Sequence, residues 1–301
     1  MPDTSTYNTT TIAAALKRYA AVTARQVDAL LHRFGSLKKI LDANQTELET
    51  MDILAEGQAG DIAQISEHLE DTDTYLRLLS ERGITATSRF DDSYPPGLFE
   101  LNDPPPLVFA RGRLPDPKAK SVAIAGASEA TNEGIELSVN TAQAFAEAGV
   151  QIISSLRKGI DASAHLGARS GKGVSFAFLE SGLDEMPEEA AQPVAFEIIQ
   201  EGGVISEHFP DEEIGASGYH MSNRLVVAAP QAVVITEFYK NSTRVLDLLE
   251  CCSQIGKLAF VLIDPRHGAL SDESSLELAI RCGAIPMVGL DKIGDITKSL
   301  V

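Results

Sequence analysis

Residues 150–165 read VQIISSLRKGIDASAH, and this stretch decides the fold class. It begins with a short apolar run, passes through serines and two basic residues to Gly159, and continues with residues that favour a helix. A buried strand that runs through a glycine turn into a helix is typical of a β-α-β unit. The stretch therefore predicts an α/β domain.

The same alternation of short apolar runs and amphipathic helices, such as Gly134–Ala148, extends from residue 120 onward. The expected strands are Val122–Ala125, Val150–Ser154, Val174–Leu179, Val204–Ser206, Ala232–Thr236, Leu258–Ile263 and Ile285–Val288. They predict a Rossmann-like, doubly wound, mostly parallel sheet. Ligands of such sheets bind beyond the carboxyl ends of the strands.

The residues before the sheet follow a helical pattern. Between residues 11 and 86 apolar positions recur every three or four residues, with breaks at Gly35 and Gly57 and with Ser36 placed to cap a helix. We expect a small all-α domain at residues 1–88, similar to SAM-like or helix-hairpin-helix modules, and the α/β domain at residues 89–301. Residues 1–88 carry 8 basic against 13 acidic side chains, which disfavours phosphate binding by this module.

The composition limits the function. The 301 residues include 25 Lys and Arg against 43 Asp and Glu, a formal net charge of −18, so a polyanion needs a local basic site. The start, MPDTSTYNTT, does not resemble a secretion signal, and no apolar run is long enough to span a membrane, so we expect a cytoplasmic protein. Three cysteines and six scattered histidines predict neither a disulfide framework nor a metal site, and we expect no cofactor.

Hydroxyl groups, amides, glycines and cations gather where predicted strands end and helices begin. The candidate nucleic-acid-binding or phosphate-binding residues are Gly126, Ser128, Ser154, Ser155, Arg157, Lys158, Gly159, Asp161, His165, Asn223, Arg224, Lys240, Ser242 and Arg244. Charge-assisted hydrogen bonds and backbone N–H donors at a helix start would hold an anion here, with Asn223 and Arg224 on the opposite wall. A structural interpretation is the alternative: Asp161 caps its helix while Arg157 and Lys158 remain solvated.

Eight short motifs follow one another in order from residue 94 to residue 237. They are YPPGL at 94–98, DPPP at 103–106, VAIAG at 122–126, the residues 154–165, GLD at 182–184, GVISE at 203–207, NR at 223–224 and ITE at 235–237. In this order the series resembles the DNA processing protein A family (DprA/Smf) over roughly residues 90–290. The resemblance implies an extended Rossmann domain that binds single-stranded DNA and is not an enzyme.

The resemblance also implies partners and a process. Members of the family assist loading of the RecA recombinase onto single-stranded DNA during natural transformation and recombination, commonly as a homodimer. We expect the dimer contact in the sheet domain, at the segment Leu258–Val288, which has few charges.

Two departures from the family pattern, at Ser128 and Ser222, each remove a positive charge. Members usually carry Arg at the positions of Ser128 and Ser222, and Ser-Gly-Ser at the positions of Ser242, Thr243 and Arg244, whereas Arg157 stands where they have a small residue. Fewer cations release fewer counterions, so we expect weaker and less salt-dependent binding of a polyanion.

A small ligand is the alternative to a polymer. Related Rossmann folds of the lysine-decarboxylase-like group bind nucleotides in the same place, which would make this chain a nucleotide-binding sensor or a phosphoribohydrolase-like protein. Such an enzyme is expected to show a glycine-rich P-G-G-x-G-T-x-x-E run. No such run precedes Thr236 and Glu237, so the enzyme version is disfavoured.

Overall fold

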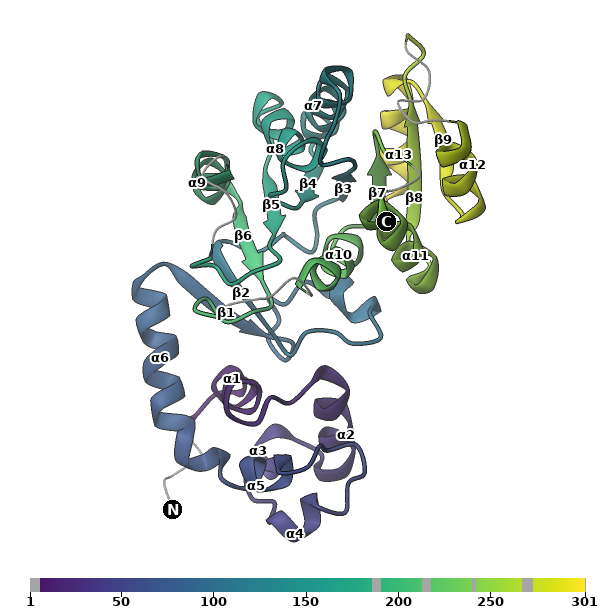
Figure 1. Ribbon diagram of the computed structural model, residues 1–301. Coiled ribbons are helices and arrows are strands. Elements are labelled where there is room, and N and C mark those ends of the chain that lie inside the picture. Colours follow the sequence, from purple (N-terminus) through teal and green to yellow (C-terminus); the bar gives the residue numbers. More distant parts are fainter. Residues whose placement is uncertain (1–5, 186–190, 213–217, 240–241, 267–272, 301) are drawn as a thin grey trace. The chain divides into compact units, whose positions relative to one another are not determined.

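The computed structural model describes residues 6–185, 191–212, 218–239, 242–266 and 273–300. The chain forms two compact units (Figure 1). The helical unit comprises Met1–Tyr94 and Asn102–Ala110, and the sheet unit comprises Pro95–Leu101 and Arg111–Val301. This division differs from a boundary between residues 88 and 89, because residues 89–94 and 102–110 pack with the helical unit.

The helical unit contains six short α-helices and a 3₁₀ turn among its described residues: α1 (Thr9–Ala20), α2 (Ala24–Phe34), α3 (Leu37–Ile40), α4 (Gln45–Leu48), α5 (Gln58–Ala63), η2 (Ile65–His68) and α6 (Leu69–Glu81). The predicted cap at Ser36 is confirmed, since its side chain accepts a hydrogen bond from the Lys39 backbone N–H at 3.2 Å. Gly35, with φ of 86°, ends α2 in the left-handed conformation that glycine tolerates best.

The prediction of an all-α domain through residue 88 is wrong at its end. The left-handed Gly83 follows α6, and β1 (Ile84–Ser88) comes next, with β2 (Leu107–Gly112) further along the chain. The β1 sequence Ile-Thr-Ala-Thr-Ser is rich in β-branched residues, which favour a strand, and Ile84 is fully buried.

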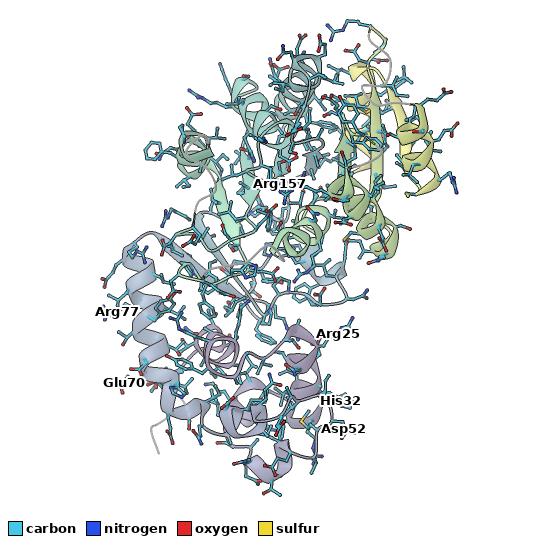
Figure 2. All side chains as sticks on the ribbon, in the orientation of Figure 1. Arg25, His32, Asp52, Glu70, Arg77 and Arg157 are labelled. Carbon is cyan, nitrogen blue, oxygen red and sulfur yellow. The ribbon has the colours of Figure 1, made fainter. Side chains whose placement is uncertain are left out.

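Charged side chains of both signs cover the helical unit. Figure 2 shows Arg25 and His32 on α2 and Glu70 and Arg77 on α6. Arg77 pairs with Glu81 one turn later on the exposed face of α6. Basic and acidic groups are therefore interspersed on these helices, which agrees with the low expectation of phosphate binding by this module.

All the strands expected in the sheet unit are confirmed to within about a residue at most ends. They are β3 (Ser121–Ala125), β4 (Gln151–Ser154), β5 (Ser175–Phe178), β6 (Gly203–Ser206), β7 (Ala232–Ile235), β8 (Leu258–Ile263) and β9 (Ile285–Val288). They lie in the order β6-β5-β4-β3-β7-β8-β9, and each neighbouring pair is parallel. The Rossmann-like parallel sheet is thus confirmed.

Helices connect these strands: α7 (Asn132–Glu147), α8 (Ile160–Ser170), α9 (Ala191–Glu201), α10 (Gly218–Ala228), α11 (Thr243–Ile255) and α12 (Glu273–Arg281), with α13 (Ile293–Ser299) after β9 and the 3₁₀ turns η3 (Pro96–Glu100) and η4 (Leu290–Lys292). Figure 1 shows α7 and α8 on the opposite side of the strands from α10 and α11. Within the described residues, none of the helices is long and apolar enough to cross a membrane.

The strand order reverses between β3 and β7, which pair directly, with Ala125 opposite Ile235. From β3 the chain proceeds to β4 on one side, and from β7 it proceeds to β8 on the other. The loops that leave these two strands therefore diverge. At such a switch point the carboxyl ends of the strands leave room for a ligand.

Candidate functional site

A pocket of about 610 Å³ lies at this switch point, within the range of roughly 300–1,000 Å³ common for ligand sites. Its walls come from three loops. The loop after β3 supplies Gly126–Glu129, the loop after β4 supplies Arg157, and the segment after β7 supplies Tyr239 and Ser242–Val245. We call it the switch-point pocket.

An ion pair between Asp161 and Arg244 lies next to this pocket, and Arg244 lines it. Arg244 Nη2 donates to Asp161 Oδ2 at 2.5 Å and Nη1 donates to Oδ1 at 3.0 Å. The same carboxylate accepts hydrogen bonds from the Ser155 hydroxyl at 2.6 Å and from the Gly126 backbone N–H at 3.3 Å. Asn223 Oδ1 accepts from Arg244 Nε at 3.1 Å. Five predicted site residues therefore form one cluster.

The pair is almost completely buried and charged. Burial raises the pKa of Asp161, but the positive charge of Arg244 and the hydrogen bonds from Arg244, Ser155 and Gly126 outweigh it, so that the pKa lies below its ordinary value. Arg244 also donates to the Gly126 carbonyl at 3.4 Å and to the Ser155 hydroxyl at 3.3 Å. All five of its N–H groups thus have partners inside the protein. Asp161 is a partner of this arginine and not a helix cap, because no side chain caps α8.

The two neighbouring cations also face carboxylates. Arg157, in the loop between β4 and α8 (Figure 2), pairs through Nε with Glu180, and both side chains are largely shielded from solvent. Lys158 is exposed and lies 4.0 Å from the exposed Glu129. Each basic side chain named here therefore has an acidic neighbour, which reduces the positive potential that the sequence alone predicts.

Close backbone approach explains two of the glycines. At Gly159, where φ is 82°, a Cβ would lie 2.4 Å from the Ala127 carbonyl oxygen, and at Gly126 it would lie 2.6 Å from that of Glu237. Two backbone hydrogen bonds join the same loops. The Ile160 N–H donates to the Ala127 carbonyl at 3.1 Å, and the Ala127 N–H donates to the Glu237 carbonyl at 2.8 Å. The three loops of the pocket are thereby held together.

His165 supports the cluster from α8. It is buried, and its Nε2 lies 3.0 Å from the Ser155 carbonyl oxygen. Burial lowers the pKa of His165 to about 4, against the opposing effects of that hydrogen bond and of Asp161. The ring is therefore neutral at physiological pH and positions Ser155 without adding charge.

The other predicted residues lie partly outside and partly at the pocket. Ser154 donates to the Ile124 carbonyl at 2.6 Å, inside the sheet, and Arg224 pairs with Glu207 at 2.7 Å beyond the end of β6. Ser128 is exposed and lines the pocket, as does Ser242, which precedes α11. Lys240 lies outside the described residues. That these residues bind phosphate stays a prediction.

Sequence reasoning missed Tyr239 and Glu180. Tyr239 lines the pocket, and its hydroxyl donates to the fully buried Glu237. That hydrogen bond, together with burial and the charge of Glu237, raises the pKa of Tyr239 to about 12. The signal in the sequence was its position a few residues beyond a strand end. The described residues contain no group of three or more His, Cys, Asp or Glu that could hold a metal ion.

The family model described as DNA recombination-mediator protein A matches residues 85–292. Among curated relatives, DNA processing protein DprA of Streptococcus pneumoniae is 31% identical over 150 residues, which cover 50% of this chain and 53% of that protein. Protein Smf of Escherichia coli is 28% identical over 183 residues, which cover 60% of this chain and 48% of that protein. The chain spans about half the length of the curated relatives it matches.

Solved structures of two DNA processing proteins resemble this chain. DNA processing protein A from Streptococcus pneumoniae gives a TM-score of 0.64 at 24% identity and covers 91% of this chain and 98% of that one. The protein of the same name from Helicobacter pylori gives a TM-score of 0.61 at 22% identity and covers 72% of this chain and 97% of that one. At these identities the two structures support the fold alone.

Proposed function

The chain belongs to the DNA recombination-mediator protein A family, and from that premise we propose that it binds single-stranded DNA at the switch-point pocket. The place of the pocket carries the proposal. It lies where the strand order reverses, and every residue that lines it falls within the matched range 85–292. Ligands of open α/β sheets bind at this edge.

The relatives support a role in DNA processing. The Streptococcus pneumoniae and Bacillus subtilis relatives are named DNA processing protein DprA, and the Helicobacter pylori structure is described by its single-stranded DNA binding mode. We propose the same role in DNA uptake and recombination for this chain, as a binding protein without a catalytic step.

Partners and place of action form the finer part of the proposal. We propose a homodimer through the sheet unit, a cytoplasmic location and a recombinase of the RecA type as partner. The family resemblance supports the dimer and the recombinase. The dimer has additional support from exposed apolar side chains on α12 and β9, where Ile280, Ile285 and Val288 are 43%, 46% and 52% exposed. Light scattering at micromolar concentration, with and without recombinase, tests both contacts.

The central experiment compares ligands on the unmodified protein. Fluorescence anisotropy with labelled oligo-dT, a duplex of equal length and free nucleotides, each at two salt concentrations, should show tightest binding to oligo-dT. Absence of oligo-dT binding would contradict the proposal. Tight binding of a free nucleotide without binding of oligo-dT would instead support a nucleotide sensor, which the pocket volume and the compensated arginines also suit.

A further inference from the structure

A second pocket, of about 350 Å³, lies between α8 and α9. Its walls come from α8, from the turn that follows α8, from the first residue of β5 and from one face of α9. Among the described residues none lines both this pocket and the switch-point pocket. We call it the α8–α9 pocket. Its volume is at the lower end of the range for ligand sites, which suits a small molecule.

One buried nitrogen at this pocket lacks a partner. His165 lines the pocket and is 3% exposed. The ring is neutral, as its low pKa implies, and its Nε2 lies 3.0 Å from the Ser155 carbonyl oxygen, which can only accept. Nε2 therefore carries the proton and Nδ1 is an acceptor, yet no group in the described part of the chain donates to it. Buried polar atoms without a hydrogen bond are rare and costly, which indicates a donor from outside the chain.

The walls around this acceptor are apolar. Val174, Val194 and Ile198 line the pocket, together with Leu166 on α8. A single acceptor among apolar side chains favours an apolar ring that carries one N–H or O–H group. A carboxylate or phosphate oxygen cannot donate to Nδ1, so the group at this end of a ligand is not a simple anion.

Charges of both signs lie at the mouth of the pocket, where the lining side chains are exposed. Arg169 on α8 and Glu197 on α9 form an exposed ion pair there. Lys172 and Glu201 also line the pocket and are exposed, and within the described ranges neither forms an ion pair. An unpaired cation and an unpaired carboxylate at one mouth suit a zwitterion, such as the α-ammonium and α-carboxylate groups of an amino acid.

Lys172 adopts a backbone conformation that favours glycine. Its φ is 55°, in the left-handed region that few residues other than Gly, Asn and Asp adopt. Hydrogen bonds from the Lys172 N–H to the Arg169 carbonyl and from the Gly173 N–H to the Ala168 carbonyl, both at 2.9 Å, fix this turn. The lysine thus stands at the pocket at a cost in conformational energy, which is typical of positions with a function.

We propose that the α8–α9 pocket binds a free aromatic amino acid whose ring carries an N–H or O–H donor, with that donor on His165 Nδ1 and the zwitterionic end at Lys172 and Glu201. Tryptophan and tyrosine belong to this class, and phenylalanine does not. A ligand without the ring donor leaves Nδ1 unpaired in the complex and should bind at least about 5-fold more weakly.

The test compares ligands that differ in the donor alone. The chain contains no Trp, so the emission of added L-tryptophan, excited beyond the absorption of tyrosine, reports the ligand. The unmodified protein should shift this emission to shorter wavelength, and equilibrium dialysis measures the affinity. We expect tyrosine to bind at least about 5-fold more tightly than phenylalanine, and tryptophan to exceed its derivative methylated on the ring nitrogen by a similar factor.

Three variants test the named residues. His165→Phe keeps a ring and removes the acceptor, so tyrosine and phenylalanine should bind it equally. Lys172→Gly removes the cation and relaxes the backbone, so it should bind tryptophan about 2- to 5-fold more weakly while unfolding in urea no earlier than the unmodified protein. Lys118→Gly is the matched control, because Lys118 is exposed in a turn outside the pocket, and it should bind tryptophan like the unmodified protein.

The outcomes decide the proposal without DNA. Absence of an emission shift, or equal binding of tyrosine and phenylalanine to the unmodified protein, would refute it and leave a buried water as the partner of Nδ1. If His165→Phe does not fold, the ligand pairs on the unmodified protein give the same decision. Equal weakening in Lys118→Gly and Lys172→Gly would refute the charged mouth. Binding of N-acetyl-L-tryptophanamide as tight as that of tryptophan would assign the pocket to a side chain of a peptide instead of a free amino acid.

Discussion

Replacement of Glu180 by Gln should strengthen the binding of single-stranded DNA and make it more sensitive to salt. Glu180 pairs with Arg157 at the wall of the switch-point pocket, where their side chains are 17% and 23% exposed. The carboxylate neutralises the arginine in the free protein. Glutamine keeps the size of the side chain and removes its charge, so that Arg157 loses the carboxylate of Glu180 as a competitor for a phosphate.

The expected magnitude follows from counterion release. Each cation that contacts a phosphate of a single strand adds about 0.7 to the slope of log affinity against log salt. Over a fourfold rise in salt, from about 50 to about 200 mM, one extra contact therefore costs about 2.6-fold in affinity. Glu180→Gln should steepen the slope by about 0.7 and bind more tightly than the unmodified protein at the lower salt.

Glu197→Gln is the matched control. Glu197 pairs with Arg169 between α9 and α8, and neither lines the switch-point pocket. Both variants make the formal net charge of −18 less negative by one unit, so a general electrostatic effect would appear in both. Anisotropy titrations of oligo-dT across the salt range measure the slopes. Equal slopes for Glu180→Gln and the unmodified protein, or equal steepening in Glu197→Gln, would refute the reasoning.

Three further predictions concern residues in or next to the cluster around Asp161 and Arg244. Replacing Arg157 and Lys158 together with Ala should lower the salt slope by about 0.7 rather than about 1.4, because Glu180 already neutralises Arg157; a loss of about 1.4 in the same titration would show that both contact phosphate. Asp161→Ala leaves the buried Arg244 without its carboxylate and should cost about 3–5 kcal/mol in urea unfolding, of which Arg244→Leu in the same background should restore part; an unchanged midpoint would contradict this. Because the pKa of His165 is about 4 in the folded protein against 6.5 unfolded, its contribution to stability is complete above about pH 6.5 and is lost as the pH falls toward 4, by about 3 kcal/mol in all. Urea midpoints of the unmodified protein and of His165→Gln should therefore converge as the pH is lowered, and parallel curves would show that His165 does not titrate in this way.

The sheet could be predicted from sequence because its strands are buried on both faces and read as continuous apolar runs. Details of the helices were harder to predict. The apolar periodicity of residues 134–148 predicts that Ile135 faces the core, yet Ile135 is 37% exposed, while Ser138 and Thr141 are fully buried. These two polar residues satisfy their hydroxyls on the carbonyls of Ile160 and Leu137. Hydrophobic periodicity does not count Ser138 and Thr141 as core residues, so the buried face that it predicts is rotated about the helix axis from the face that is buried in the structure.

The site was predictable in its place but not in its pairing. Strand ends and glycine turns predict that Gly126, Ser155 and Asp161 lie at one edge of the sheet, and they do lie there together, since parallel strands bring their carboxyl ends to one edge. That they bind a ligand stays a prediction. The partner of each arginine depends on contacts far apart in sequence. Arg244 and Asp161 are 83 positions apart, and Arg157 and Glu180 are 23 apart. No local pattern encodes such pairs.

These pairs explain how a chain with a charge of −18 can hold a polyanion without presenting a strongly basic surface. A carboxylate beside each arginine of the pocket fixes the guanidinium in place, but it also reduces the gain in free energy when a phosphate arrives, because the phosphate replaces an interaction that already exists. Binding must then draw on groups whose interaction with DNA has no internal competitor.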